Sequence, residues 1–444
     1  MSLALFRVGN FLSINDTIEL SFIPDEEFGT EKGCVEDGFL QIAALFGANA
    51  SGKTNIVLAF DYLRYLIVGE HSLISTKNIG RLNGDVSCPF NESSVTHFEL
   101  FFKSIHLFNL SYVLDFDSSK GEVIKETLTL YESDSDGIIL LERIGSEFVL
   151  NPGSMTDGFN AAQTLLDKVG LKIGMPVIHQ LVNSDIDWPP TYFVHMVLDN
   201  LYILASNDYE YDDIYSYHGI DDLRIVLDFL VELTDVSDAY LSNPDELPTI
   251  VCHFSDQLSD HEYALAHNSE KMQLIDVDDK RSYDILFAIG SENKLLMYTH
   301  LSSGVKRIID VVLRILSTKI KSTSPAVDEK IGITVNMIEH SKTKPYTYVY
   351  DEICYALHPT IVNRLIEKLL REEPNSQFIM TFHESEFLIS DDIRKDEIWF
   401  VKKDDNQTTV ESLSQFDCSE SSDVKNEYLN NRFEGTPRFS GGLD

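Results

Sequence analysis

The sequence has few cysteines, few basic residues and no long apolar segment, and each shortage excludes a class of protein. Its five cysteines among 444 residues are scattered without C-x-x-C spacing, which argues against a disulfide framework and a zinc site. No apolar run is long enough to cross a bilayer, and the first residues have the pattern of a strand, not of a signal peptide. We therefore expect a cytoplasmic protein with no membrane partner.

Positive charge is also scarce, with 35 Lys and Arg against 72 Asp and Glu and a net charge of −37. A chain with this balance repels polyanions, so direct nucleic-acid binding by this chain alone is disfavoured, although a local basic groove stays open. The excess acid serves either solubility or the docking of a basic partner. No long heptad run and no internal repeat is present, so coiled-coil arms are not expected.

One motif stands out against this background. An apolar run at 40–46, typical of a buried strand, leads into the pattern G-x-x-x-x-G-K-[ST], from Gly47 to Thr54. Gly47 and Gly52 let the backbone turn its N–H groups toward a β-phosphate, Lys53 brings a point charge to the β- and γ-oxygens, and Thr54 offers a hydroxyl to Mg²⁺.

The residues after this loop support the same interpretation. Residues 55–67 have the apolar spacing of an amphipathic helix, so the loop lies where a strand changes to a helix and the helix N-terminus faces an anion. An ordinary glycine-rich turn is the alternative, and the flanking strand and helix disfavour it. The pattern therefore predicts a nucleotide-binding protein.

The rest of the chain divides by pattern into three parts. We expect short strands at 3–11 and 17–22, at the edge of the nucleotide sheet, and an antiparallel β layer between 97 and 143. Helical spacing then predicts an inserted helical subdomain. The predicted parts are an N-terminal half of an ATPase domain (1–150), a helical insertion (151–279) and a C-terminal half (280–444). Within the insertion, the acidic, tyrosine-rich segment 207–217 is either a metal loop or, more simply, a solvated connector.

Three later segments carry further chemistry. Ser302, Ser303 and Gly304 precede an apolar helix, where N–H groups and a hydroxyl could bind a phosphate oxygen, or where they form an ordinary helix cap. The apolar strand 346–350 ends in Asp351 and Glu352. Phosphoryl transfer needs positioning and charge neutralisation, so Asp351 would hold Mg²⁺ through water and Glu352 would polarise the attacking water.

The third segment is the strand 377–382, which ends in His383. Such a histidine is usually a packed or solvated residue. Because it lies one strand beyond the acidic pair, we interpret it as a polar sensor of the γ-phosphate.

Together these residues resemble the ABC-type ATPase heads of the SMC and OLD (overcoming-lysogenization-defect) proteins. Within that class they are similar to the stand-alone prokaryotic AAA-family ATPases related to OLD and RloC-like proteins, many of which are encoded in anti-phage abortive-infection systems. The matching segments are an Asn-Phe-x-Ser opening at 10–13, the phosphate loop at 47–54, a signature at 301–304, a Walker B pair at 351–352, a D-loop region at 356–359, a switch histidine at 381–383 and a closing motif at 426–437.

The resemblance implies a head-to-tail dimer that encloses two ATP molecules. Each site would combine residues of both copies: Lys53, Thr54, Asp351, Glu352 and His383 of one with Ser303 and Gly304 of the other. The implied catalytic residues are Glu352, His383 and Lys53, and the metal ligands are Thr54 and Asp351. The implied nucleotide contacts are Gly47, Asn49, Ser51, Gly52, Lys53, Thr54, Asn55, Ser302, Ser303 and Gly304.

The sequence departs from the family pattern at two places, and each departure weakens one of these implied functions. Leu12 stands where such ATPases usually carry a basic residue, and Arg7 is the only cation nearby in the sequence. No glutamine occurs between Gln41 and Gln163 to form the usual glutamine loop, and Asn91 lies in that region. The first departure argues against a nucleotide contact at Leu12, and the missing glutamine implies altered metal coordination or slower hydrolysis.

The sequence therefore predicts an α/β P-loop NTPase of the ABC-head type that binds ATP and Mg²⁺. We expect it to hydrolyse ATP as a homodimer or higher homo-oligomer. Its resemblance implies a sensor or regulatory subunit of a defence system that controls a separately encoded effector, a nuclease or toxin. The alternatives are an SMC-like ATPase of DNA repair or maintenance, a nucleotide-gated scaffold with negligible hydrolysis, and, more distantly, a P-loop kinase of small molecules.

Overall fold

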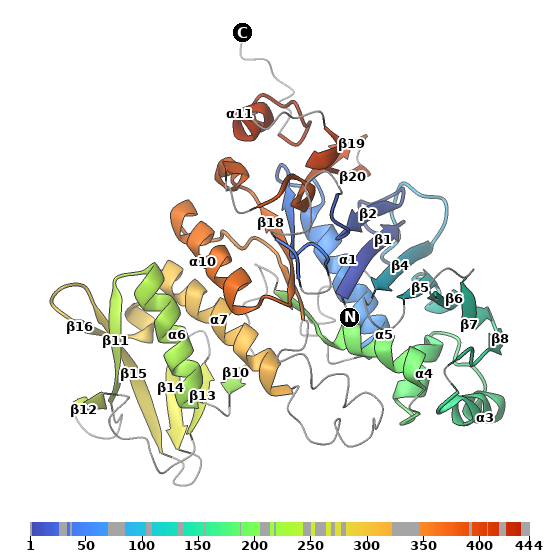
Figure 1. Ribbon diagram of the computed structural model, residues 1–444, viewed down its shortest axis with the longest axis horizontal. Coiled ribbons are helices and arrows are strands. Elements are labelled where there is room, and N and C mark those ends of the chain that lie inside the picture. The colour runs from blue at the N-terminus through green and yellow to red at the C-terminus, as the bar shows by residue number, and fades with distance from the viewer. Residues whose placement is uncertain are drawn as a thin grey trace. The chain divides into compact units, whose positions relative to one another are not determined.

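A computed structural model describes most of the chain and is drawn in Figure 1. The described residues are 2–25, 33–35, 38–69, 85–103, 109–131, 137–154, 156–186, 188–204, 214–216, 219–242, 250–253, 263–267, 271–276, 281–321, 346–389, 393–405, 407–416 and 423–436. By packing, the chain forms two compact units. Unit 1 comprises Met1–Ala205, Thr343–Ile353 and Leu370–Asp444, and unit 2 comprises Ser206–Lys342 and Cys354–Leu369. The three-part division at residues 150 and 279 stays an interpretation of the sequence.

A six-stranded, mainly parallel sheet lies at the centre of unit 1, in the order β20-β19-β3-β18-β17-β9. Its strands are β3 (Ile42–Phe46), β9 (Leu201–Leu204), β17 (Thr347–Tyr350), β18 (Gln377–Phe382), β19 (Ile398–Asp404) and β20 (Gln407–Ser412). Only β20 pairs antiparallel, with β19. Because β3, β17 and β18 run in the same direction, the residues that follow them meet at one edge of the sheet.

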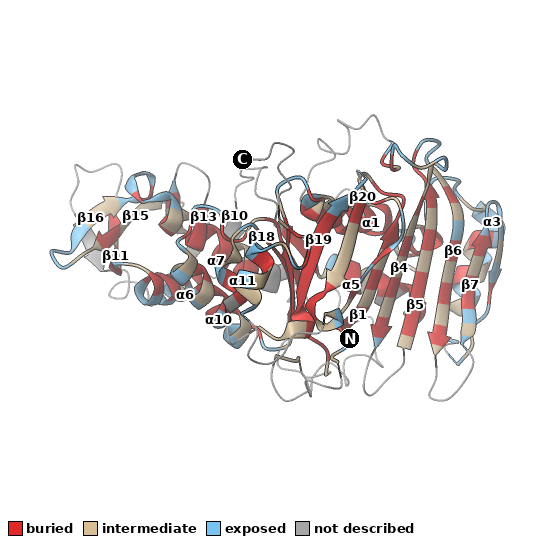
Figure 2. Ribbon diagram, turned by 90° about the horizontal axis from the view of Figure 1, so that it is seen from above, coloured by how far each residue is buried: buried red, intermediate tan, exposed pale blue. Residues whose placement is uncertain are grey.

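The second sheet of unit 1 is antiparallel, in the order β2-β1-β4-β5-β6-β7-β8. Its strands are β1 (Ser2–Gly9), β2 (Ile18–Ser21), β4 (Val95–Lys103), β5 (Asn109–Asp117), β6 (Glu122–Tyr131), β7 (Ile138–Ile144) and β8 (Glu147–Leu150). Buried residues alternate with more exposed ones along them, as Figure 2 shows. The predicted β layer is confirmed. The first two strands, expected at the edge of the nucleotide sheet, belong to this second sheet, where β1 pairs with β2 and β4, and β2 contacts the edge strand β20 of the nucleotide sheet.

Helix α1 (Lys53–Val68) contributes to the core that joins the two sheets of unit 1. Ile56 and Phe60 of the helix share one apolar cluster with Ala43 of β3 and with Phe6 of β1, and the Phe6 and Phe60 rings stack 3.8 Å apart. A helix that is apolar on most of its surface is stable only when neighbours cover it. The core therefore fixes the strand–loop–helix unit that carries the phosphate loop.

Shorter helices complete unit 1. They are α3 (Phe159–Val169), α4 (Val177–Val182), α5 (Pro189–Asp199), α11 (Val424–Leu429) and the 3₁₀ turns η3 (Ser385–Ile389), η4 (Lys395–Glu397) and η5 (Leu413–Gln415).

No helix among the described ranges is long and apolar enough to span a membrane.

Unit 2 combines a further antiparallel sheet with helices, in the order β10-β13-β14-β15-β11-β12, with β16 beside β15. Its strands are β10 (Ile214–Ser216), β11 (Val236–Ser242), β12 (Ile250–His253), β13 (Tyr263–His267), β14 (Met272–Asp276), β15 (Ser282–Ile289) and β16 (Lys294–Met297). Its helices are α6 (Gly219–Leu233), α7 (Ser303–Lys321), the turn η2 (Tyr298–His300) and most of α10 (Pro359–Glu372). The helices that lie within the expected helical insertion are divided between the units, with α6 here and α3 in unit 1. The strands between 201 and 276 were not anticipated.

Candidate functional site

The phosphate loop joins β3 to α1 and curls around the ammonium group of Lys53. The Lys53 side chain is buried, and its Nζ donates to the carbonyl oxygens of Gly47 at 2.6 Å and Ala48 at 2.9 Å. Gly52 immediately precedes the helix with φ 111°, a backbone conformation that favours glycine. The loop residues expected from the sequence are thus assembled at one helix N-terminus.

The loop also has features that suit a bound phosphate. The hydroxyl of Ser51 is buried and its Oγ has no hydrogen-bond partner within the described part of the chain. The first turn of α1 holds no acidic residue, so no carboxylate opposes the positive end of its dipole. Asn49 and Thr54, in contrast, are exposed. A polar atom buried without a partner is costly, and an incoming phosphate oxygen would satisfy it.

Asp351 follows β17 and lies against Thr54. Its Oδ2 accepts the Thr54 hydroxyl at 3.0 Å and its Oδ1 accepts the Thr381 hydroxyl at 2.7 Å. Burial raises the pKa of Asp351, while the two hydroxyls and the nearby Lys53 act in the opposite direction. The two expected magnesium ligands are therefore neighbours.

These two side chains fit a magnesium ion that keeps other ligands. No group of three or more His, Cys, Asp or Glu in the described ranges is placed to hold a metal by itself. Magnesium commonly takes one or two protein oxygens together with water and substrate phosphates. Thr54 and Asp351 supply such a partial set.

Glu352 is held in an unusual backbone conformation beside them. It has φ 53°, and its N–H donates to the Thr381 hydroxyl at 2.7 Å. Its Oε1 lies 2.8 Å from Nε2 of His383, at the end of the adjacent strand β18. The two side chains keep 26% and 31% of their surfaces exposed, so water can reach this pair. Backbone strain of this kind is concentrated at functional sites.

Thr381 has a role that the sequence reasoning did not assign. One hydroxyl donates to Asp351 and accepts from the backbone of Glu352, and the residue is fully buried. The available signal was its position two residues before His383 in a strand next to the one that delivers the acidic pair.

The signature residues lie at the start of α7 in unit 2. Ser302 caps this helix, because its Oγ accepts the Val305 N–H at 3.3 Å, and both Ser302 and Ser303 are exposed. A Cβ on Gly304 would lie 3.1 Å from the carbonyl oxygen of Ala356, in the expected D-loop region. Lys53, Thr54, Asp351, Glu352 and His383 are thus brought together in unit 1, whereas Ser302–Gly304 belong to unit 2.

Asn55 and the residues at the departures from the family pattern have structural partners. The Asn55 amide donates to Ser13 Oγ at 2.6 Å. The Arg7 guanidinium binds Glu19 and Glu99 on neighbouring strands of the antiparallel sheet. The Asn91 amide, in the region expected for a glutamine loop, donates to Asn15 Oδ1 at 2.9 Å.

The segments beyond the switch histidine support the nucleotide sheet. Phe433 and Tyr428 of the closing motif stack on Phe400 of β19, with ring centroids 4.5 and 5.5 Å away. The Tyr428 hydroxyl donates to the carbonyl of Gly435 at 3.1 Å. The acidic segment 207–217 and residue 437 of the closing motif lie largely or wholly outside the described residues.

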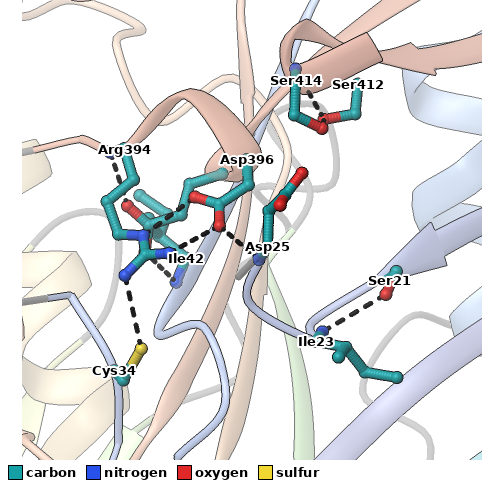
Figure 3. A network of polar contacts seen from close by, with 10 residues as sticks. Ser21, Ile23, Asp25, Cys34, Ile42, Arg394, Asp396, Ser412 and Ser414 are labelled. Atoms are coloured by element: carbon teal, nitrogen blue, oxygen red, sulfur yellow. Dashed lines mark hydrogen bonds and ion pairs between the residues drawn. The ribbon is translucent and has the colours of Figure 1, made fainter. Parts of the chain in front are cut away.

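A buried polar network anchors the other end of β3 (Figure 3). Arg394 binds Asp396 through two nitrogens, at 2.8 and 2.6 Å, and Asp396 also accepts the backbone N–H of Asp25 at 2.9 Å. The carboxylate of Glu397 accepts the N–H groups of Arg394 at 2.8 Å and of Ile42 at 3.3 Å. Burial raises the pKa of Glu397 to about 8.

This geometry confirms the expected α/β fold, with a phosphate loop between a parallel strand and a helix and with an antiparallel β layer. No protein-family model and no curated protein matches the chain. Among solved structures, an SMC head domain from Thermotoga maritima is 12% identical, with 93% of this chain and 99% of that chain covered and a TM-score of 0.40. An SMC head bound to the C-terminal winged-helix domain of ScpA is 15% identical (93% and 97% covered, TM-score 0.42). The recombination mediator protein RecF is 12% identical (92% and 98% covered, TM-score 0.33).

Proposed function

We propose that this chain is an ATP-binding and ATP-hydrolysing head that works as a homodimer. The observation that carries the proposal is the continuous set of contacts from Thr54 through Asp351 and Thr381 to Glu352 and His383, directly beside the loop that encloses Lys53. A phosphate loop alone is compatible with many nucleotide-binding proteins. An adjacent carboxylate with access to water adds a hydrolytic function.

The residues divide this chemistry among them. Lys53 and the N-terminus of α1 hold the phosphates, with Asn49 and the Ser51 hydroxyl as further contacts. Bound to Thr54 and Asp351, Mg²⁺ would neutralise charge on the phosphate oxygens. Glu352 takes a proton from the attacking water. Since a carboxylate oxygen only accepts, His383 donates its Nε2 proton to Glu352 and fixes the orientation of the carboxylate.

The second copy would complete the site with its Ser302, Ser303 and Gly304. This arrangement is supported by the exposure of the two serines at the N-terminus of the long helix α7, where backbone N–H groups lack partners within the helix. Two heads placed head to tail would each present that terminus to the other's ATP. ATP would then hold the dimer together and hydrolysis would release it.

For the wider role, we propose a sensor or regulatory subunit of an anti-phage defence system that acts through a separate effector. Its support is the motif resemblance alone. An SMC-like role in DNA repair or maintenance is the main alternative, and the net charge of −37 is its main difficulty. The absence of a glutamine from residues 42–162 keeps open a nucleotide-gated scaffold with negligible hydrolysis.

The test is a comparison of ATP hydrolysis by the wild type, Lys53→Ala and Glu352→Gln, each with and without DNA. We expect magnesium-dependent hydrolysis that both substitutions abolish and that DNA leaves unchanged. Binding without turnover in the wild type would favour the scaffold. Strong stimulation by DNA would favour the maintenance role.

A further inference from the structure

The β19–β20 hairpin contacts the phosphate loop at both of its motif glycines. A Cβ on Gly47 would lie 2.2 Å from the carbonyl oxygen of Val401, and a Cβ on Gly52 would lie 2.0 Å from Oγ1 of Thr408. Neither site can hold a side chain while the hairpin stays in place. Glycine is therefore required at both positions because the hairpin leaves no room for a side chain, and not only because the loop backbone must approach the phosphate.

Thr408 also joins a chain of hydrogen bonds to the loop. Its Oγ1 donates to the Ser51 carbonyl at 2.9 Å and lies 2.6 Å from Ser13 Oγ, which accepts from the Asn55 amide at 2.6 Å. A hydroxyl has one proton to donate. Because Thr408 donates its proton to the Ser51 carbonyl, Ser13 must donate to Thr408. The three hydrogen bonds therefore all point in one direction, from the Asn55 amide to the Ser51 carbonyl.

The position of Thr408 is itself firmly set. Its backbone N–H donates to the carbonyl of Ser13 at 2.8 Å, and the side chain is 1% exposed. On the partner strand, Phe400 is fully buried beneath the stacked rings of Tyr428 and Phe433. Thr408 is thus held in place by its own packing and hydrogen bonds, and from this position it binds Ser51, the loop residue that precedes Gly52.

We propose that Thr408 is a positioning residue of the nucleotide site, and this inference rests on the proposed function. By holding the Ser51 carbonyl on the side of the hairpin, Thr408 keeps the following N–H groups, those of Gly52, Lys53 and Thr54, oriented toward the bound phosphates. Without its hydroxyl, the buried Ser51 carbonyl and the Ser13 hydroxyl both lose a partner. The loop must then reorient each time nucleotide binds, and this reorientation lowers the affinity for nucleotide.

The experiment compares Thr408→Val, which keeps the shape and removes the donor, with Thr408→Ser, which keeps the hydroxyl. Thr409→Val is the control, because successive side chains of β20 point to opposite faces and Thr409 is only partly buried. The measurements are the Kd of the full-length chain for magnesium-ATP and the midpoint of thermal unfolding without nucleotide. We expect about tenfold weaker binding for Thr408→Val. Thr408→Ser and Thr409→Val should stay within about twofold of the wild type.

Each result has one meaning. Wild-type affinity in Thr408→Val overturns the inference, and so does equal weakening in Thr408→Ser, because packing would then be the cause. If Thr408→Val does not fold, Thr408→Ala removes the same hydroxyl with a smaller side chain, and unchanged affinity in that variant overturns the inference. A wild-type protein that binds no nucleotide overturns the proposed function together with this inference.

Discussion

Replacing Glu397 by glutamine should change how the stability of this protein depends on pH. The Glu397 carboxyl is buried at the turn before β19, where it accepts the N–H groups of Arg394 and Ile42. Glutamine cannot ionise and keeps the shape of the side chain. Its amide has a single oxygen, so it can accept only one of these two N–H groups, which bind different oxygens of Glu397. The loss of the other bond lowers the free energy of unfolding at every pH alike, so burial of the charge is read from the pH dependence alone.

The magnitude follows from the pKa of this group. In the unfolded chain Glu397 ionises near its ordinary value of 4.5, whereas burial raises the pKa to about 8 in the folded protein. Between these values the folded state holds a proton that the unfolded state has lost. By linkage, stability falls as pH rises through this window, by at most about 5 kcal/mol and, with relaxation of the site, by about 2–4 kcal/mol.

The assay is chemical denaturation of the wild type and Glu397→Gln at several pH values from 4.5 to 9. Glu372→Gln is the control, because its side chain is 54% exposed. We expect the free energy of unfolding of Glu397→Gln to rise relative to the wild type as pH increases, and the difference to level off above pH 8. Parallel curves for the two proteins would refute the reasoning.

Substitutions at three further positions test individual contacts. Gly52→Ala should lower the free energy of unfolding by about 2–5 kcal/mol, because φ is 111° and Thr408 occupies the space of the new Cβ; denaturation curves that match the wild type would contradict this. Thr381→Val should lower kcat about 10–100-fold with the Kd for ATP within about threefold, and Thr381→Ser should restore turnover. A fall in affinity alone would instead place Thr381 among the binding residues. Gly304→Asp should leave ATP binding by the single chain intact and prevent its ATP-dependent association, as measured by sedimentation; association like that of the wild type would remove Gly304 from the shared site.

The central part of the site could be predicted because it follows from local pattern and from the rules of parallel sheets. The apolar run before Gly47 and the helical spacing after Thr54 specify a strand, a loop and a helix. Asp351 and His383 each end an apolar strand, and adjacent parallel strands place their ends at the same edge. Contacts of this kind can be expected from the sequence because the position of each residue is determined by the strand that it follows.

The contacts that brace the site could not be predicted in the same way. Ser13 and Thr408 are 395 positions apart, and no local pattern relates them. Among the strands of unit 2 that the sequence did not predict, β13 and β14 have five residues each, too few for alternation to be distinguished from other patterns. Glu397 was not singled out, because its importance lies in burial at a turn and not in any motif.

The most direct test of the central claim is the mass of Glu352→Gln in solution with magnesium and ATP. If Glu352 activates water and ATP joins two heads, this variant should bind ATP, lose about 10²–10⁴-fold in hydrolysis and sediment as a stable dimer, whereas Lys53→Ala stays monomeric. Hydrolysis at the wild-type rate would contradict the role of Glu352. A monomer that binds ATP but never associates would contradict the shared site.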